Sequence, residues 1–309
     1  MKQQQIKALV KIADLGSIRA AAEALNTSQS SLTRAMRELE DSLGAQILNR
    51  SFRGVSFTPA GEALLRRARM IVETVARAEQ EVRQISGGKG AKVAVAVTPV
   101  VAGTVLGDIY RQFKNQMPDA TLVLTEGLLT SIVPGLIEGR LDFGIAIASQ
   151  EALPSELVFK PLAQVLTAVA GREGHPLSGG SSWPELLSAP WVLNQSLGSS
   201  SNSLLDWLDS QDMPRPKEIV QCTSPQIMLE MMRRTDLIGL APARYISDRF
   251  SGAGVELFKV RPLPPLLQLG VVRVRGAPLT PAAHLFETLV SRILQSSFAE
   301  ELRAPDIDL

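Results

Sequence analysis

The chain has 309 residues, of which 45% are hydrophobic and 20% charged, and its 32 basic and 31 acidic side chains leave a formal net charge of +1. This length predicts two or three domains with sizeable cores, and the high apolar content with the low net charge excludes an intrinsically disordered chain. The sequence contains no run of about 18 uncharged apolar residues, so no membrane span is predicted. The single cysteine argues against a disulfide framework, and the presence of only two histidines argues against a histidine-rich metal site.

The charge is distributed unevenly along the chain. Residues 1–90 contain 14 Lys and Arg against 9 Asp and Glu, a net of +5, whereas the remaining residues carry a net of −4. A basic N-terminal third indicates that this end meets a polyanion, although such an imbalance is also typical of a solvated face. The single Cys222 and an N-terminus without the apolar segment of a signal peptide predict a cytoplasmic protein.

Residues 1–58 predict three short helices followed by a hairpin. The first helix ends at Gly16, the second spans residues 18–25 after a Ser17 N-cap, and the third runs from a Thr27 or Ser28 cap to about Leu43. Two short β-prone runs then flank a basic tip at residues 50–54. Three helices and a basic hairpin in this order predict a winged helix-turn-helix.

The third helix has two faces of different chemistry. At 100° per residue, an apolar stripe forms the face expected to be buried: Leu32, Met36, Leu39 and Leu43. The opposite face carries Ser30, Arg34 and Arg37, with Gln29, Ser31 and Thr33 at its sides. Short polar groups with two guanidiniums fit a helix that enters a DNA groove, and the alternative is a pair of solvated arginines.

The residues of this region carry a family resemblance. Residues 16–25 and 28–40, then Leu43-Gly44, residues 48–50 and residues 58–61, resemble the DNA-binding domain of LysR-type transcriptional regulators in order and spacing. Ser30 stands where that family usually has Pro, and Leu48 where it often has Phe. The resemblance, together with the faces above, assigns these DNA-binding candidates: Arg19, Ser28, Gln29, Ser30, Ser31, Thr33, Arg34, Arg37, Arg50 and Arg53.

These candidates have different expected roles. Arg34 and Arg37 are expected to bind guanine edges or phosphates, and Gln29 to pair with adenine. Arg50 and Arg53 suit phosphate or minor-groove contacts from the wing, while Arg50 could equally brace the wing from within.

A long helix with a heptad repeat is predicted after Pro59. Apolar residues recur at alternating spacings of four and three: Leu64, Ala68, Ile71, Val75, Ala78, Val82 and Ile85. This period favours a dimerising coiled coil, which the resemblance also implies, over a helix packed only on its own domain. The glycine-rich residues 86–90 are expected to form a hinge.

From residue 91 the pattern changes to short strands alternating with helices. Strands at 93–97, 121–125 and 141–147 with helices at 101–114 and 129–139 predict a parallel, buried βαβαβ unit. Further strands are expected at 165–170, 191–193, 219–222, 237–240 and 267–274, with helices near 203–209, 226–233 and 281–299. The resemblance, here looser, implies a periplasmic-binding-protein-like domain of two Rossmann-like α/β subdomains, I (about 91–162 and 267–309) and II (about 163–266).

The second half of the sequence contains no arrangement of residues that is typical of a catalytic site. It has no G-x-S-x-G elbow and no carboxylate pair, and residues 87–90 lack P-loop spacing. His175 is expected in a loop, His284 in the last helix, and Cys222 as an inert strand residue with a redox role as the minor alternative. Neither a cofactor nor a metal site is expected.

Hydroxyl-bearing helix starts after the strands predict a small-molecule site, since ligands of open α/β sheets bind beyond the carboxyl ends of strands. The candidates are Thr98, Pro99, Thr130, Ser131, Ala148, Ser149, Ser199, Ser200, Ser201, Asn202, Thr223, Ser224 and Pro225. For any one of them, ordinary N-capping is the simpler interpretation, and their convergence on one cleft is implied by the family fold. Scarce basic residues in these loops argue against a phosphate and for a small organic acid, aromatic ones included.

The sequence therefore predicts an effector-responsive transcriptional regulator of the LysR type. Residues 1–58 bind double-stranded operator DNA, residues 59–90 pair two chains, and residues 91–309 bind the effector, with tetramers and contact to RNA polymerase implied by the family alone. Two alternatives remain at this point: a solute-binding domain whose ligand is structural, and an enzyme. The effector, the target genes and the choice between activation and repression do not follow from the residues.

Overall fold

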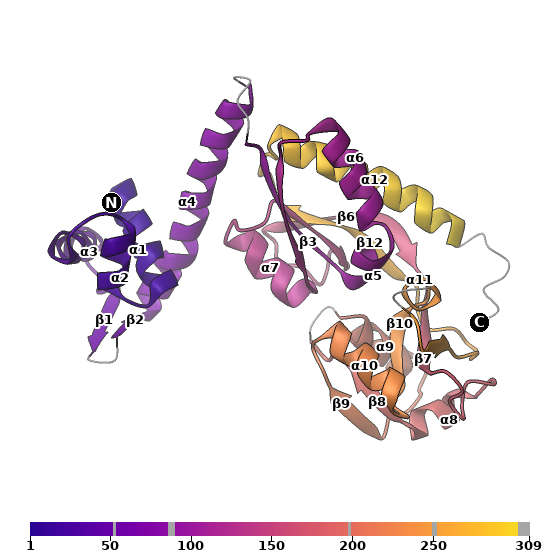
Figure 1. Ribbon diagram of the computed structural model, residues 1–309. Coiled ribbons are helices and arrows are strands. Elements are labelled where there is room, and N and C mark those ends of the chain that lie inside the picture. Colours follow the sequence, from indigo (N-terminus) through magenta and orange to yellow (C-terminus); the bar gives the residue numbers. More distant parts are fainter. Residues whose placement is uncertain (52–53, 86–89, 197–198, 249–251, 302–309) are drawn as a thin grey trace. The chain divides into compact units, whose positions relative to one another are not determined.

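The computed structural model describes residues 1–309 except 52–53, 86–89, 197–198, 249–251 and 302–309 (Figure 1). Six side chains beside these gaps also lie outside the described part: Arg50, Ser51, Gln84, Ile85, Glu300 and Glu301. The chain divides into two compact units, Met1–Gly88 with Ile137–Arg140, and Lys89–Leu136 with Leu141–Leu309. In the described part, no helix is long and apolar enough to cross a membrane.

Three short helices open the first unit: α1 (Gln3–Leu15), α2 (Ile18–Ala24) and α3 (Gln29–Leu43). The Ser17 hydroxyl accepts the backbone N–H of Ala20 at the start of α2, and Ser28, one of the two predicted caps, begins α3. Gly16 and Gly44 end α1 and α3 with φ of 64° and 63°, which a side chain would disfavour. The predicted order of helices and caps is confirmed.

The buried stripe of α3 is one turn shorter than predicted. Leu32, Met36 and Leu39 are at most 4% exposed and form a core with α1 and α2, but Leu43 is 43% exposed. Leu43 is the last residue of the helix, and the chain turns away at Gly44 before a partner can cover it.

A hairpin and a long helix complete the first unit. Strands β1 (Leu48–Ser51) and β2 (Gly54–Phe57) pair antiparallel, as predicted, and α4 (Pro59–Ile85) follows. The Glu40 carboxylate accepts the backbone N–H groups of Ile47 and Leu48 at 2.8 and 3.0 Å, which fixes the hairpin to α3. An ion pair of 2.7 Å between Arg69 and Asp14 holds α4 against α1.

The second unit contains a five-stranded mixed sheet. Its strands are β3 (Lys92–Val97), β4 (Thr121–Glu126), β5 (Phe143–Ile147), β6 (Leu157–Val165) and β12 (Leu267–Val274), in the order β4-β3-β5-β12-β6. Strand β3 pairs in parallel with β4 and β5, which confirms the predicted βαβαβ unit, whereas β12 is antiparallel to both of its neighbours. Helices α5 (Pro99–Thr104), α6 (Leu106–Gln116), α7 (Leu129–Ile137) and α12 (Pro281–Glu301) accompany this sheet.

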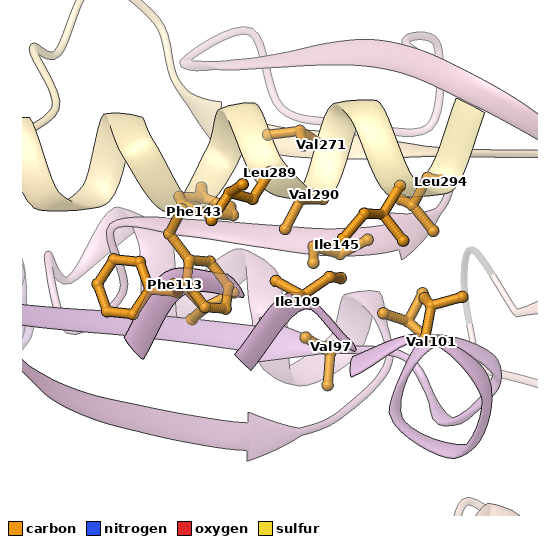
Figure 2. Packing of buried hydrophobic residues seen from close by; sticks show 14 of the residues in the cluster. Val97, Val101, Ile109, Phe113, Phe143, Ile145, Val271, Leu289, Val290 and Leu294 are labelled. Carbon is orange, nitrogen blue, oxygen red and sulfur yellow. The ribbon is translucent and has the colours of Figure 1, made fainter. Parts of the chain in front are cut away.

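The core of this sheet forms where α6 and α12 meet it. The Phe113 ring of α6 packs edge-to-face on Phe286 of α12, with ring centroids 5.1 Å apart. Figure 2 shows Phe143 and Ile145 of β5 filling the space between these two helices. All four side chains are fully buried, so burial of apolar area stabilises this layer.

Two expectations for this sheet are wrong in detail. The helix predicted over 101–114 is two helices, because the chain breaks at Val105, after the weak helix formers Gly103 and Thr104. Strand β4 was expected to be buried, yet Val123 and Leu124 are 41% and 39% exposed. It is an edge strand, paired only with β3.

Two smaller sheets form the rest of the second unit. Strands β7 (Thr167–Arg172), β10 (Gly239–Pro242) and β11 (Val255–Leu257) pair antiparallel in the order β10-β7-β11, and β8 (Pro190–Leu193) pairs in parallel with β9 (Glu218–Gln221). The helices are α8 (Trp183–Ser188), α9 (Ser200–Ser210), α10 (Pro225–Arg234) and α11 (Ala243–Ser247). The strand predicted over 165–170 is in fact the end of β6 and the start of β7, so the chain changes sheets at Leu166. The multidomain α/β fold class is confirmed.

Candidate functional site

The N-terminus of α3 carries a cluster of serine hydroxyls. Ser28 Oγ accepts the backbone N–H of Ser31 at 3.1 Å and lies 2.9 and 2.8 Å from the hydroxyls of Ser30 and Ser31. All three residues are exposed, as is Gln29 beside them, and Thr33 is half-buried. Ser28 therefore caps the helix while the neighbouring polar groups stay open to solvent.

Two of the predicted DNA-binding arginines are engaged in helical ion pairs. Arg34 Nε lies 3.1 Å from Glu38 Oε1, and Arg19 Nε lies 3.1 Å from Glu23 Oε1, each pair at i,i+4 and solvent-exposed. Arg37, also exposed, has no ion-pair partner within the described residues. The side chain of Arg50 and all of Arg53 lie outside the described part.

The predicted seam on α4 changes character along the helix. Ala68 is fully buried in the core of the three short helices, and Leu64 packs against that core. Farther on, Ile71, Ala78 and Val82 are exposed, Val82 by 63%, while Val75 is half-buried. The Ile85 side chain lies outside the described part. The second half of the seam is thus an apolar stripe without a cover in one chain.

A pocket lies among the carboxyl ends of strands in the second unit, and we call it the inter-sheet pocket. It encloses about 100 Å³, of the order of the roughly 150 Å³ cavity that holds a benzene molecule. Its lining residues are Thr98, Pro99, Val100, Leu128, Leu129, Ile147, Asn194, Ser199, Ser200, Ser201, Pro225, Met228, Leu229, Met232, Leu240, Ala241, Pro242, Tyr245 and Ile246. They come from both the five-stranded sheet and the smaller sheets.

Only part of the predicted small-molecule site lines this pocket. Six candidates do so: Thr98, Pro99, Ser199, Ser200, Ser201 and Pro225. The others do not: Thr130, Ser131, Ala148, Ser149, Asn202, Thr223 and Ser224. For Ser224 the capping interpretation holds, since its hydroxyl accepts the Ile227 N–H.

The apolar walls and Asn194 were not predicted. Met228, Leu229 and Met232 project from α10, and Leu240 and Ile246 follow from β10 and α11. A sequence signal for Asn194 exists, because it follows directly on the strand predicted over 191–193. The apolar wall residues gave no such signal in the sequence, because their pattern is typical of residues in a hydrophobic core.

Two of the lining residues each carry a buried polar atom that lacks a hydrogen-bond partner within the described residues: Thr98 Oγ1 and Asn194 Nδ2. Among the described residues that line the pocket, none is charged. Burial raises the pKa of the Tyr245 phenol, and the nearby Glu126 carboxylate acts in the same direction, so this wall presents a neutral hydroxyl.

The side chains of His175 and Cys222 contact backbone groups of nearby residues, and His284 is exposed on α12. The buried His175 accepts the Leu177 N–H on Nδ1 at 3.0 Å and places Nε2 3.2 Å from the Asp236 carbonyl. Cys222 Sγ lies 3.4 Å from the Ser224 carbonyl. In the part of the chain with described coordinates, no group of three His, Cys, Asp or Glu side chains is placed to hold a metal ion.

Two known protein families together match nearly the whole chain. Residues 3–62 match the bacterial regulatory helix-turn-helix proteins of the lysR family, and residues 86–294 match the LysR substrate binding domain. The HTH-type transcriptional regulator TdcA of Escherichia coli K12 is 25% identical over 291 residues, covering 93% of this chain and 92% of that protein. The regulator GbpR of Azospirillum brasilense is 24% identical over 295 residues, covering 92% and 84%.

Solved structures show the same fold. Full-length CbnR in complex with its target DNA superposes with a TM-score of 0.67 at 22% identity, covering 94% of this chain and 99% of CbnR. A full-length OxyR variant of Pseudomonas aeruginosa superposes with a TM-score of 0.69 at 19% identity, covering 94% of each chain.

Proposed function

Because the chain belongs to the LysR family of DNA-binding transcriptional regulators, with a helix-turn-helix and an effector-binding domain, we propose that a small molecule in the inter-sheet pocket controls its action on promoter DNA. Residues 1–58 would bind the operator, residues 59–90 would join two chains, and residues 91–309 would bind the effector. Such a regulator acts in the cytoplasm, where bacterial DNA is.

The observation that carries this proposal is the inter-sheet pocket itself. It is lined from both the five-stranded sheet and the smaller sheets, at the carboxyl ends of β3, β5 and β8, where α/β sheets bind their ligands. The small organic or aromatic acid expected from the sequence fits its dimensions, with the body on the apolar wall of α10 and the carboxyl group near the start of α9.

DNA binding is proposed to use the exposed face of α3. Ser30, Ser31 and Thr33 are short enough to let the helix approach base edges, and Gln29 is placed to pair with adenine. Arg34 and Arg37 supply guanidinium forks for guanine or phosphate. Arg19 and Ser28 contribute from α2 and the α3 cap, and Arg50 and Arg53 from the wing. The net charge of +5 over residues 1–90 supports the binding of this part of the chain to a polyanion.

Self-association is proposed through α4. The exposed apolar residues Ile71, Ala78 and Val82 continue a heptad spacing, and a second copy of the helix would cover them. Two DNA-binding domains joined in this way read two half-sites of an operator. Tetramers and contact with RNA polymerase extend this proposal by family likeness.

Coupling between the two sites requires that the effector prefers one arrangement of the protein. A ligand that contacts both sets of sheets favours one relative placement of them, and this preference is a coupling free energy that changes operator binding.

The experiment that tests the function has two steps. DNA fragments are first enriched from a random pool on the full-length protein, and the enriched site is then footprinted with and without small organic acids. Protection of a two-fold symmetric site that changes with at least one acid supports the proposal. Binding without sequence preference contradicts DNA regulation, and a footprint that never changes while a ligand saturates the protein favours a structural ligand.

A further inference from the structure

Asn194 is held so rigidly that only one of its polar groups is left over. Its side-chain Oδ1 accepts the backbone N–H of Ser196 at 2.9 Å, which sets the orientation of the amide. Its backbone N–H donates to Ser201 Oγ at 3.1 Å, and its carbonyl accepts from the Ser199 hydroxyl. The Nδ2 group remains, buried on the pocket wall and without a partner in the described part of the chain.

Thr98 shows the same arrangement on the other wall. Its backbone N–H donates to the Ile145 carbonyl at 3.0 Å, and its own carbonyl accepts from Val101 and Ala102. The hydroxyl does not cap α5, and Oγ1 has no partner among the described residues. Thr98 and Asn194 are only 2% and 3% exposed.

A buried donor without a partner loses the hydrogen bond that it makes to water in the unfolded chain, and such groups are rare in native proteins. Here two of them line the same pocket, and neighbouring serines hold one of them in place. A ligand oxygen that accepts from these groups replaces the lost hydrogen bond, so they predict where the ligand's polar head lies.

The remaining wall limits the ligand's charge and body. Met228, Met232 and Leu240 present apolar surface, and the described residues of the lining include no Lys, Arg, His, Asp or Glu. A dianion brought into such a pocket would be desolvated without a counter-charge. One negative charge is more tolerable, because α9 begins at Ser200 on the same wall and helix N-termini favour anions.

We infer that Asn194 determines the specificity of the inter-sheet pocket, and that its ligand has a compact apolar body, a head with an acceptor oxygen, and at most one negative charge. This inference rests on the proposed function, which makes the pocket the effector site, and it adds the chemical groups that the pocket recognises. Asn194 Nδ2 donates to the head, with Thr98 Oγ1 as the second donor, and the body packs on α10.

The test uses four compounds with one ring in common and the full-length protein. Isothermal titration measures the affinity of benzoate, benzamide, phthalate and toluene. Benzoate and benzamide are expected to bind, with toluene at least about tenfold weaker because it lacks an acceptor. Phthalate is expected to be similarly weak because of its second charge. Toluene or phthalate binding as tightly as benzoate, or no binding by any of the four, overturns the ligand class.

Variants test the residue itself. Asn194→Asp keeps an oxygen for the Ser196 N–H and replaces the donor with an acceptor of nearly the same shape, so benzoate should bind at least about tenfold more weakly. Benzamide should lose less affinity in this variant, because its NH2 group can donate to the new carboxylate. Thr98→Val removes only the hydroxyl and should weaken both by several-fold even if Asn194→Asp folds poorly. Ser291→Ala is the matched control, since Ser291 Oγ is also buried and unpartnered in the described structure but does not line the pocket.

The role of Asn194 and the proposed function can be disproved independently. Benzoate affinity that is unchanged in both Asn194→Asp and Thr98→Val overturns the inference. The proposed function still stands if a ligand changes the DNA footprint of those variants. Loss of benzoate binding in the variants with operator binding intact supports the inference.

Discussion

Arg34 and Glu38 form an ion pair on the exposed face of α3, with Arg34 Nε 3.1 Å from Glu38 Oε1. The Arg34 side chain is 83% exposed and Glu38 46%, so the pair contributes little to stability. If Arg34 binds DNA as proposed, the carboxylate next to the guanidinium competes with DNA for the same N–H donors. Arg37, one turn along the same face, has no such competitor among the described residues.

Glu38→Gln is expected to strengthen DNA binding by several-fold. The change removes a negative charge from the helix that we propose to face DNA, and it frees Arg34. The gain should be larger for the enriched site than for random DNA, because the lost negative charge helps both DNAs equally whereas a freed Arg34 reads a base only in the enriched site. Fluorescence anisotropy with both DNAs measures it, and urea unfolding checks that stability changes by less than about 0.5 kcal/mol. Unchanged or weaker binding would show that the pair does not restrain Arg34.

Arg34→Ala is expected to weaken binding to the enriched site by at least about tenfold and to weaken binding to random DNA less. A guanidinium that reads a guanine edge contributes about 1–3 kcal/mol of discrimination. The measurement is a gel shift at several salt concentrations, with Arg19→Ala on α2 as the comparison. Equal losses on both DNAs would identify Arg34 as a phosphate contact and contradict base reading.

The caps of the first unit were predictable because each depends on residues close in the chain. Ser17, Ser28 and the glycines at 16 and 44 fix helix ends through their own backbone or side chain, so no distant partner is needed. The break between α5 and α6 was missed because the apolar spacing continues through it. The change of sheets at Leu166 was missed because one apolar run spans the end of β6 and the start of β7.

The lining of the inter-sheet pocket was predicted only in part, for a related reason. Hydroxyls at helix starts are visible in a sequence, but their partners are not. Ser199 and Ser201 were expected to face a ligand, and the structure uses their hydroxyls to hold the backbone of Asn194. Asn194 itself follows a strand, where an asparagine is typical of a turn. Its free Nδ2 becomes evident only when segments about 100 residues apart are brought together around one pocket.

Val82→Glu is expected to weaken self-association through α4 by at least about tenfold. Val82 is 63% exposed in one chain and occupies a seam position, where two glutamates would repel and lose apolar contact. Ala76→Glu is the matched control, because Ala76 is exposed on the same helix but lies off the heptad positions. Sedimentation equilibrium measures both variants. Equal association of Val82→Glu and wild type would place the interface elsewhere.

Phe113→Ala is expected to destabilise the second unit by about 3–5 kcal/mol, because it leaves a cavity in a core that is otherwise closed. Phe113 is fully buried and its ring meets Phe286 edge-to-face at 5.1 Å, so the aromatic pair is lost along with the buried area. Tyr110→Ala on the same helix is the control, since Tyr110 is 47% exposed, and it should change the free energy of unfolding by far less. Urea unfolding followed by circular dichroism measures both.

The α6–α12 core and the inter-sheet pocket belong to the same unit, so Phe113→Ala should also weaken benzoate binding if it loosens the unit as a whole. Loss of stability with unchanged benzoate affinity would mean that the pocket does not depend on this core.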